Sequence, residues 1–188
     1  MAKTYQKEKI NPARFLDCGS GTGLLGGAVR KLWPDAHITG IDFADDMLDQ
    51  SVTDGCADDI VLFDLMKADW PVEDESFDLV GAASVINYAA DPHQFISNMA
   101  DATRKGGHVM LSYLTGQKNT QSETDDGTMS YLWSGQEIKD CFAECEIELI
   151  SSRDTQTYTG RGLHRIDSII IGFKGHMGLP KRPNKKAP

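Results

Sequence analysis

The sequence predicts an α/β fold with a doubly wound, mostly parallel seven-stranded sheet that ends in an antiparallel C-terminal hairpin. Two observations predict this class. Short apolar segments of β-like character alternate along the chain with helical segments, as they do in sheets covered by helices on both faces. In addition, the first apolar segment is followed at once by the run DCGSGTG at residues 17–23. A glycine-rich turn between a first strand and a first helix is typical of nucleotide sites in such sheets.

The first half of the chain supplies four strands and two helices. Pro34 ends the first helix, because the residue before a proline disfavours helical geometry. Asp45 and Asp46 stabilise the start of the second helix through its dipole. The apolar residues Phe77 and Leu79 indicate a buried strand. The expected strands are residues 14–18, 37–41, 60–63 and 76–83, and the expected helices are residues 22–33 and 44–53.

The second half begins with a strong helix signal, Asp91 as the N-cap followed by Pro92 at the first helical position. Ser134 and Glu137 form a capping box for a later helix. The expected helices are residues 91–104 and 134–142, and the expected strands are residues 108–114, 146–151 and 165–173, the last two forming the antiparallel pair. The polar stretch 115–128 predicts a long mobile loop. We expect one domain over residues 1–178 and a basic, disordered tail over residues 179–188.

Composition and charge narrow the class of protein. The chain has 188 residues, of which 40% are hydrophobic and 25% charged, and its formal net charge is −9. This acidic balance argues against nucleic acid and anionic membranes as partners. No apolar stretch has the length of a membrane span and the N-terminus lacks a signal peptide, so we expect a cytoplasmic protein. The four cysteines include no C-x-x-C pair, and we expect free thiols and no metal site.

The acidic residue before the glycines indicates which cofactor the turn binds. Gly19, Gly21 and Gly23 let the backbone turn sharply and leave room for a ligand against it. The carboxylate of Asp17 repels a dinucleotide pyrophosphate but attracts a cationic amino group or sulfonium. The turn therefore fits S-adenosylmethionine (SAM) better than NAD. Residues 21–26 do match G-x-G-x-x-G, but a lone match is weak evidence and a nicotinamide oxidoreductase is a distant alternative.

Several motifs agree in order and spacing, and together they resemble the class I SAM-dependent methyltransferases, specifically the small-molecule branch with a seven-stranded sheet. The resemblance covers residues 14–113, a little over half of the chain. The motifs that carry it are FLDCGSGTG at 15–23, IDFADDML at 41–48, SFDLV at 76–80 and RKGGHV at 104–109.

This resemblance implies roles for the residues that bind SAM and its demethylated product SAH. Asp17 lies near the amino group and sulfonium of the methionine portion, and a turn aspartate is the alternative. Asp42 ends the second strand, where a carboxylate accepts hydrogen bonds from ribose hydroxyls, unless it is only a solvated loop residue. Phe43 and Met47 flank the adenine ring, although Met47 also suits the core of its helix.

The third and fourth strands carry the remaining cofactor candidates. Asp64 accepts a hydrogen bond from the exocyclic amine of adenine, with Asp69 as a nearby competitor for that role. The backbone amide of Leu65 reaches a ring nitrogen. Ala83 and Ser84 line the methionine side of the site.

Methyl transfer is an in-line displacement, so the main task of the protein is alignment and desolvation. A general base is needed only if the acceptor must lose a proton. His164 is a catalytic candidate because it titrates near neutrality, with a surface histidine as the alternative. Tyr88 is a second candidate, which we expect to close over the methyl group.

The sequence lacks two motifs that are typical of other acceptor classes, which favours a small-molecule methyl acceptor whose identity stays open. Residues 84–88 read SVINY in place of Asn/Asp-Pro-Pro-Tyr/Phe, which argues against methylation of adenine or glutamine amines. The chain has no Pro-Cys dipeptide, the nucleophile of C5-cytosine methylation.

Only about 13 residues precede the first strand, fewer than in the resembling proteins. We expect one of three arrangements around the cofactor: an open site for a large partner, closure by a second subunit (a homodimer or a partner chain), or closure by the 115–128 loop. A second function therefore stays open, a methyltransferase-like protein that binds SAM or SAH without methyl transfer, as a partner-activating subunit or an enzyme such as a cyclase.

Overall fold

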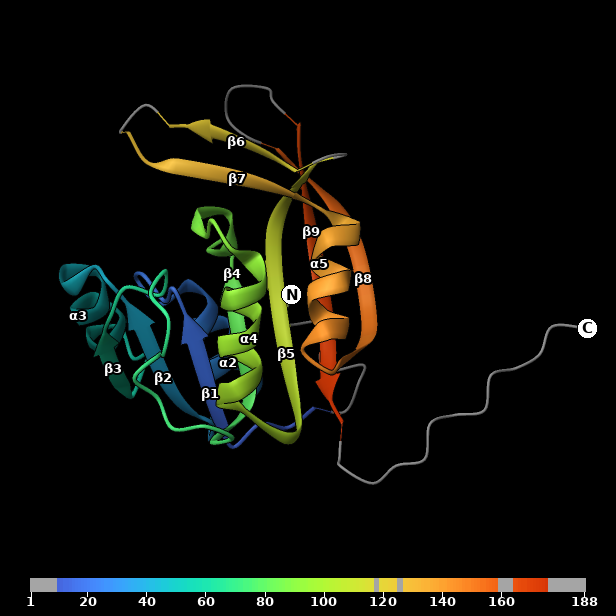
Figure 1. Ribbon diagram of the computed structural model, residues 1–188. Helices are drawn as coiled ribbons and strands as arrows, with labels where there is room; N and C mark the ends of the chain where they lie inside the picture. The colour runs from blue at the N-terminus through green and yellow to red at the C-terminus, as the bar shows by residue number, and fades with distance from the viewer. Residues whose placement is uncertain (1–9, 117–118, 125–126, 159–163, 176–188) are drawn as a thin grey trace, which may run out of the picture.

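A computed structural model describes residues 10–116, 119–124, 127–158 and 164–175, with the backbone alone at 155–158 and 164–167. The basic tail predicted at 179–188 and the first nine residues lie outside the described part. The described residues form a nine-stranded sheet with helices on both faces (Figure 1).

The main sheet follows the order β3-β2-β1-β4-β5-β9-β8. The first five of these strands are parallel, whereas β9 pairs antiparallel with both β5 and β8. The predicted mostly parallel sheet and its antiparallel C-terminal pair are therefore confirmed. The strands are β1 (Arg14–Cys18), β2 (His37–Asp42), β3 (Asp59–Leu62), β4 (Phe77–Ala83), β5 (Thr103–Gly116), β8 (Ile147–Tyr158) and β9 (His164–Lys174).

The predicted mobile loop at 115–128 is wrong for the residues that the structure describes. They contain the end of β5, the strand β6 (Thr120–Glu123) and the turn that leads into β7 (Met129–Ser134). Gly127 adopts φ 84 in the turn, and Thr124 donates a backbone hydrogen bond to Thr128 at 2.8 Å. Every residue of β6 is exposed, so the segment lacks the apolar alternation from which strands are predicted. This β6–β7 hairpin raises the strand count from seven to nine and projects beyond the end of β5 (Figure 1).

The two helices with predicted capping residues begin where those residues predict, whereas the first helix begins at Leu24, two residues later than predicted. The side chain of Asp91 accepts a hydrogen bond from the Gln94 amide at 3.0 Å, and Ser134 caps the later helix through the Glu137 amide at 3.2 Å. The helices are α2 (Leu24–Leu32), α3 (Asp45–Thr53), α4 (Pro92–Ala102) and α5 (Gly135–Glu144), with the 3-10 turn η2 (Ile86–Tyr88). In the part of the chain that the structure describes, no helix is both long and apolar enough to cross a bilayer.

Adjacent residues of the buried strands contribute to two different cores. Phe15 and Leu79 pack in the cluster that contains α2, whereas Leu16 and Val80 pack in the cluster that contains α4 and α5. Side chains alternate across a strand, so strands that are apolar at every position bury both faces. The carboxyl edge of the parallel strands is left to form a site.

The start of β1 is held to β4 by one carboxylate. Oδ2 of Asp78 accepts hydrogen bonds from the backbone amides of Ala13 and Arg14 at 2.8 and 2.7 Å, while Oδ1 pairs with the Arg104 guanidinium. Partial burial raises the pKa of Asp78, but the hydrogen bonds from Arg104, Arg14 and Ala13 outweigh it and hold that pKa below its usual value. The ionised carboxylate therefore stabilises the fold at neutral pH.

We expect Asp78→Ala to lower the free energy of unfolding by about 1.5–3 kcal/mol, the range for hydrogen bonds to a charged group. Urea denaturation at pH 7 measures this loss. Because the folded-state pKa is depressed, the contribution is present above the ordinary aspartate pKa and disappears as the pH falls through the folded value. Asp78→Asn, which keeps an acceptor for the amides, should lose less. Equal stability of Asp78→Ala and the wild type would contradict this role.

Candidate functional site

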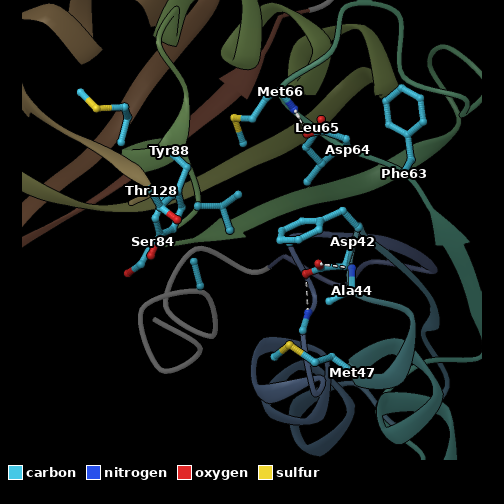
Figure 2. Close-up of a pocket in the computed structure, with 16 residues that line it drawn as sticks. Asp42, Ala44, Met47, Phe63, Asp64, Leu65, Met66, Ser84, Tyr88 and Thr128 are labelled. Atoms are coloured by element: carbon cyan, nitrogen blue, oxygen red, sulfur yellow. Dashed lines mark hydrogen bonds between the residues drawn. The ribbon is translucent and has the colours of Figure 1, made fainter. Parts of the chain in front are cut away.

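A cavity of about 590 Å³ opens at the carboxyl ends of the parallel strands (Figure 2). Most of the residues predicted for the site lie in its wall. Those predicted residues are Gly19, Gly21, Asp42, Phe43, Met47, Asp64, Leu65, Ala83, Ser84 and Tyr88. The wall also contains residues that the sequence analysis missed, namely Ala44, Phe63, Met66, Val85, Thr128 and Met129.

The carboxylate of Asp42 links two loops at the base of this cavity. Its Oδ2 accepts a hydrogen bond from the Gly21 amide at 2.8 Å, and its Oδ1 accepts one from the Ala44 amide at 3.1 Å (Figure 2). An ionised carboxylate offers about four acceptor positions. Asp42 therefore holds the glycine turn and retains acceptor capacity toward the cavity, where it is half-buried.

The glycine turn has two cavity glycines and one that serves the helix. Gly19 adopts φ 70, and a Cβ there would lie 2.2 Å from a methyl carbon of Val85. Gly21 adopts φ 51 beside Met47. Gly23 lies outside the cavity wall and is the N-cap of α2, with φ 83. The left-handed conformation explains why glycine stands at all three positions.

Asp17 lies beneath the turn and outside the cavity wall. Its side chain is 1% exposed, and Oδ2 accepts hydrogen bonds from the Gly26 amide at 2.9 Å and the Ser20 hydroxyl at 3.3 Å. Oδ1 has no hydrogen-bond partner among the described residues. Burial raises the pKa of Asp17 to about 7, against the opposing hydrogen bonds from Gly26 and Ser20 and with a further increase from the charge of Asp42. Asp17 thus joins the end of β1 to α2 and changes charge near neutrality.

Apolar side chains and one further carboxylate form the wall on the β2 and β3 side. Phe43 is 76% exposed and Met47 43% exposed, so Met47 is not a core residue of its helix. Oδ1 of Asp64 accepts a hydrogen bond from the Met66 amide at 3.0 Å, and Leu65 is buried next to it. Asp64 lines the cavity, whereas its predicted competitor Asp69 is not in the wall.

Ser84 has a strained backbone at the end of β4. Its φ is 61, and its amide donates a hydrogen bond to the Ser112 carbonyl at 2.8 Å. A non-glycine residue in the left-handed region costs about 1 kcal/mol or more and is enriched at functional sites. The strain turns the chain sharply from β4 into η2 beside the cavity.

The buried Asn87 fastens the hairpin to the sheet, and the sequence analysis missed it. Its Nδ2 donates to the carbonyls of Leu114 and Tyr131 at 3.0 and 2.6 Å, and its Oδ1 accepts from the Leu114 amide at 2.9 Å. The indole of Trp133 adds a hydrogen bond to the Ile86 carbonyl at 3.2 Å. These contacts hold β7, and with it Thr128 and Met129, against η2. No short motif signals them, because the partners are backbone atoms distant in sequence.

Comparison with known proteins identifies the family. Residues 16–111, just over half of the chain, match the family described as a methyltransferase domain. The chain belongs to this methyltransferase domain family. The match runs from β1 into β5 and therefore contains the glycine turn, Asp42 and Asn87.

Individual relatives of this methyltransferase domain are distant. A malonyl-[acyl-carrier protein] O-methyltransferase of Laribacter hongkongensis is 30% identical over 114 residues, which are 55% of this chain and 38% of that protein. The chain spans between 38% and 49% of the length of the curated relatives that it matches.

Solved structures agree in fold. A SAM-dependent methyltransferase of Methanosarcina mazei has a TM-score of 0.74 at 15% identity, covering 92% of this chain and 97% of its own. A putative methyltransferase of Haloferax volcanii, solved in complex with the Trm112 methyltransferase activator, has a TM-score of 0.73 at 15% identity, covering 95% and 90%. At these identities the likeness shows the fold alone.

The predictions for His164, Cys141 and Cys145 concern residues outside the cavity wall. His164 begins β9, and its side chain is outside the described part, so its role as a base is still a prediction. Cys141 and Cys145 lie at the end of α5 as free thiols. Among the described residues, no group of three or more potential ligands is placed to hold a metal ion.

We expect Asp17→Asn to remove a pH dependence of stability. The folded-state pKa of Asp17 is raised to about 7 from 3.8, so its contribution to stability is full below the unfolded value and is lost as the pH rises through the folded one. Relative to the wild type, Asp17→Asn should gain about 2–3 kcal/mol in free energy of unfolding between pH 5 and pH 8, at ~1.4 kcal/mol per unit. Urea denaturation across this pH range measures the gain in free energy of unfolding. Parallel plots of stability against pH for the two proteins would contradict the raised pKa of Asp17.

We expect Asn87→Ala to release the hairpin, because each buried polar group left unpaired costs about 1–3 kcal/mol. Amide hydrogen exchange should become faster in β7 while β1 keeps its protection. Asn98→Ala is the matched control, since Asn98 is also buried but contacts Gln94 within its own helix. Unchanged exchange in β7 would show that the hairpin does not depend on Asn87.

Proposed function

We propose that the protein is a SAM-dependent methyltransferase that acts on a small-molecule acceptor. The observation that carries the proposal is the arrangement around Asp42, whose carboxylate holds the glycine turn and faces a cavity in a member of the methyltransferase domain family. A carboxylate oxygen that accepts hydrogen bonds at the end of β2 suits ribose hydroxyls, which donate them.

The other cavity residues fit the adenosine portion of SAM. Phe43 and Met47 offer apolar surfaces for the two sides of an adenine ring. Asp64 keeps one oxygen available after its bond to the Met66 amide, and that oxygen accepts a hydrogen bond from the exocyclic amine. The backbone amide of Leu65 donates to a ring nitrogen. The donors and acceptors of adenosine thus have partners on adjacent strands.

The methionine portion lies along the glycine turn and the end of β4. Gly19 and Gly21 leave room for it, and Ala83 and Ser84 line it from the other side. Asp17 lies beneath the turn, and its Oδ1, which has no hydrogen-bond partner among the described residues, favours the cationic methionine portion when the carboxyl is ionised. SAM, when bound, supplies a methyl group activated by a sulfonium. The residues of this chain then orient the acceptor and exclude water, the terms that dominate such a displacement.

The compartment and the partners form part of the same proposal. All four cysteines are free thiols, which fits a reducing compartment such as the cytoplasm. Leu24 at the start of α2 and Phe43 in the cavity wall are 87% and 76% exposed, and exposed apolar side chains of this kind favour cover by a second copy or another chain. The Haloferax volcanii neighbour, crystallised with its activator, supports a partner chain.

We expect Asp42→Ala to weaken SAH binding by about 1–3 kcal/mol, which is about 5- to 150-fold, because ribose hydrogen bonds are lost. Isothermal titration calorimetry measures the change. Asp45→Ala is the matched control, because Asp45 is an exposed aspartate at the start of α3. Unchanged affinity of Asp42→Ala would mean that ribose binds elsewhere.

Titration of the wild-type protein with SAM, SAH and NAD in parallel tests the proposal as a whole. We expect binding of SAM and SAH and none of NAD. Failure of both SAM and SAH to bind would overturn the proposal. Binding without turnover over a panel of small-molecule acceptors would favour the alternative of a SAM-binding protein that transfers no methyl group.

A further inference from the structure

The cavity has two chemically different halves. Figure 2 shows Tyr88 and Thr128 across the cavity from Asp42, Ala44 and Met47. The half around Asp42 and Asp64 is the cofactor half of the proposed function. The opposite half, called here the acceptor wall, consists of Tyr88, Thr128 and the adjoining Met129. Met66 beside Asp64 and Val85 beside Gly19 border it.

From these halves we infer that the acceptor is an uncharged, mainly apolar nitrogen compound, such as an aromatic amine, and that Met129 of the hairpin helps to select it. This inference rests on the proposed function, because it takes the first half of the cavity to be occupied by the cofactor. It names the substrate class of the same site.

The charges of the cavity residues favour an uncharged acceptor. The charged side chains among the described cavity residues are the carboxylates of Asp42 and Asp64, and these residues include no lysine, arginine or histidine. SAM carries one net positive charge, so the two carboxylates already exceed it. An anionic acceptor would enter a site with excess negative charge and no described cation to pair with it, which is unfavourable.

The exposed side chains of the acceptor wall and of the bordering Met66 favour an apolar ligand. Met66 is 42% exposed, Met129 38% and Tyr88 49%. Thioethers and an aromatic ring provide polarizable, adaptable contacts for a flat apolar ligand. Covering these side chains removes apolar surface from water, at about 25 cal/mol per Å². The wall therefore gains most from an apolar acceptor.

Proton chemistry selects nitrogen as the nucleophile. The described acceptor wall offers the hydroxyls of Tyr88 and Thr128 but no histidine, lysine or carboxylate that would act as a base. An uncharged amine needs none, because its lone pair is available at neutral pH. That lone pair forms the bond to the methyl carbon while the carbon–sulfur bond breaks and its electron pair passes to sulfur. The resulting ammonium then loses a proton to water.

The test uses two probes with the same naphthalene ring and different charge, 1-naphthylamine and 1-naphthoate, titrated by fluorescence into the full chain saturated with SAH. We expect the amine to bind at least about tenfold more tightly, a difference of ~1.4 kcal/mol. Met129→Lys adds a cation to the acceptor wall, and it should raise naphthoate affinity about fivefold or more while SAH affinity stays within about twofold. Ile150→Lys is the matched control, because Ile150 is 37% exposed on β8, outside the cavity.

The outcomes separate this inference from the proposed function. If SAH does not bind, the proposed function fails and the inference fails with it. If SAH binds but naphthoate binds as tightly as naphthylamine, or neither probe binds, only the acceptor class is overturned. An equal response of Met129→Lys and Ile150→Lys would remove Met129 from the selection of the acceptor.

Discussion

The carboxylate of Asp42 accepts hydrogen bonds from two amides that belong to different connections of the sheet. Gly21 lies in the turn between β1 and α2, and Ala44 precedes α3. Because β1 pairs with β2 up to Cys18 and Ile41, the two strand ends are already adjacent. The carboxylate then fixes the conformation of both loops that follow. The base of the cavity depends on this contact together with the hydrogen bond from the Gly19 amide to the Ile41 carbonyl at 2.8 Å.

The sequence predicts the cofactor half well because its residues follow from sheet geometry. Asp42, Asp64, Ala83 and Ser84 each stand at or just beyond the end of a predicted strand, and parallel strands bring such ends to one edge. Strand position and the family resemblance together were therefore enough to place these residues in one predicted site. The orientation of Asp17 was not predictable in this way, because it depends on a hydrogen bond to Gly26 nine residues later.

Tyr88 of the acceptor wall was predicted, but the hairpin residues Thr128 and Met129 were not, because the signals of the hairpin are not local. All of β6 is exposed, and Asn87 holds β7 through the Tyr131 carbonyl, 44 residues away in sequence. A polar stretch with a glycine fits a loop as well as a hairpin when no face of it is buried. The resemblance also ends near residue 113, before the hairpin begins.

Among the described residues, the Asn87 side chain forms its hydrogen bonds with main-chain atoms of Leu114 and Tyr131. Hydrogen bonds of this kind depend on the course of the main chain and do not involve the side chains of Leu114 and Tyr131. Except at Trp133, whose indole also donates a hydrogen bond to the Ile86 carbonyl, substitutions in β7 and in the turn before it can therefore accumulate without loosening the anchor, while the cofactor half stays unchanged. The hairpin is in this respect an exchangeable module, and grafting a different hairpin onto the same anchor is a direct route to new substrate specificity by divergence or by design.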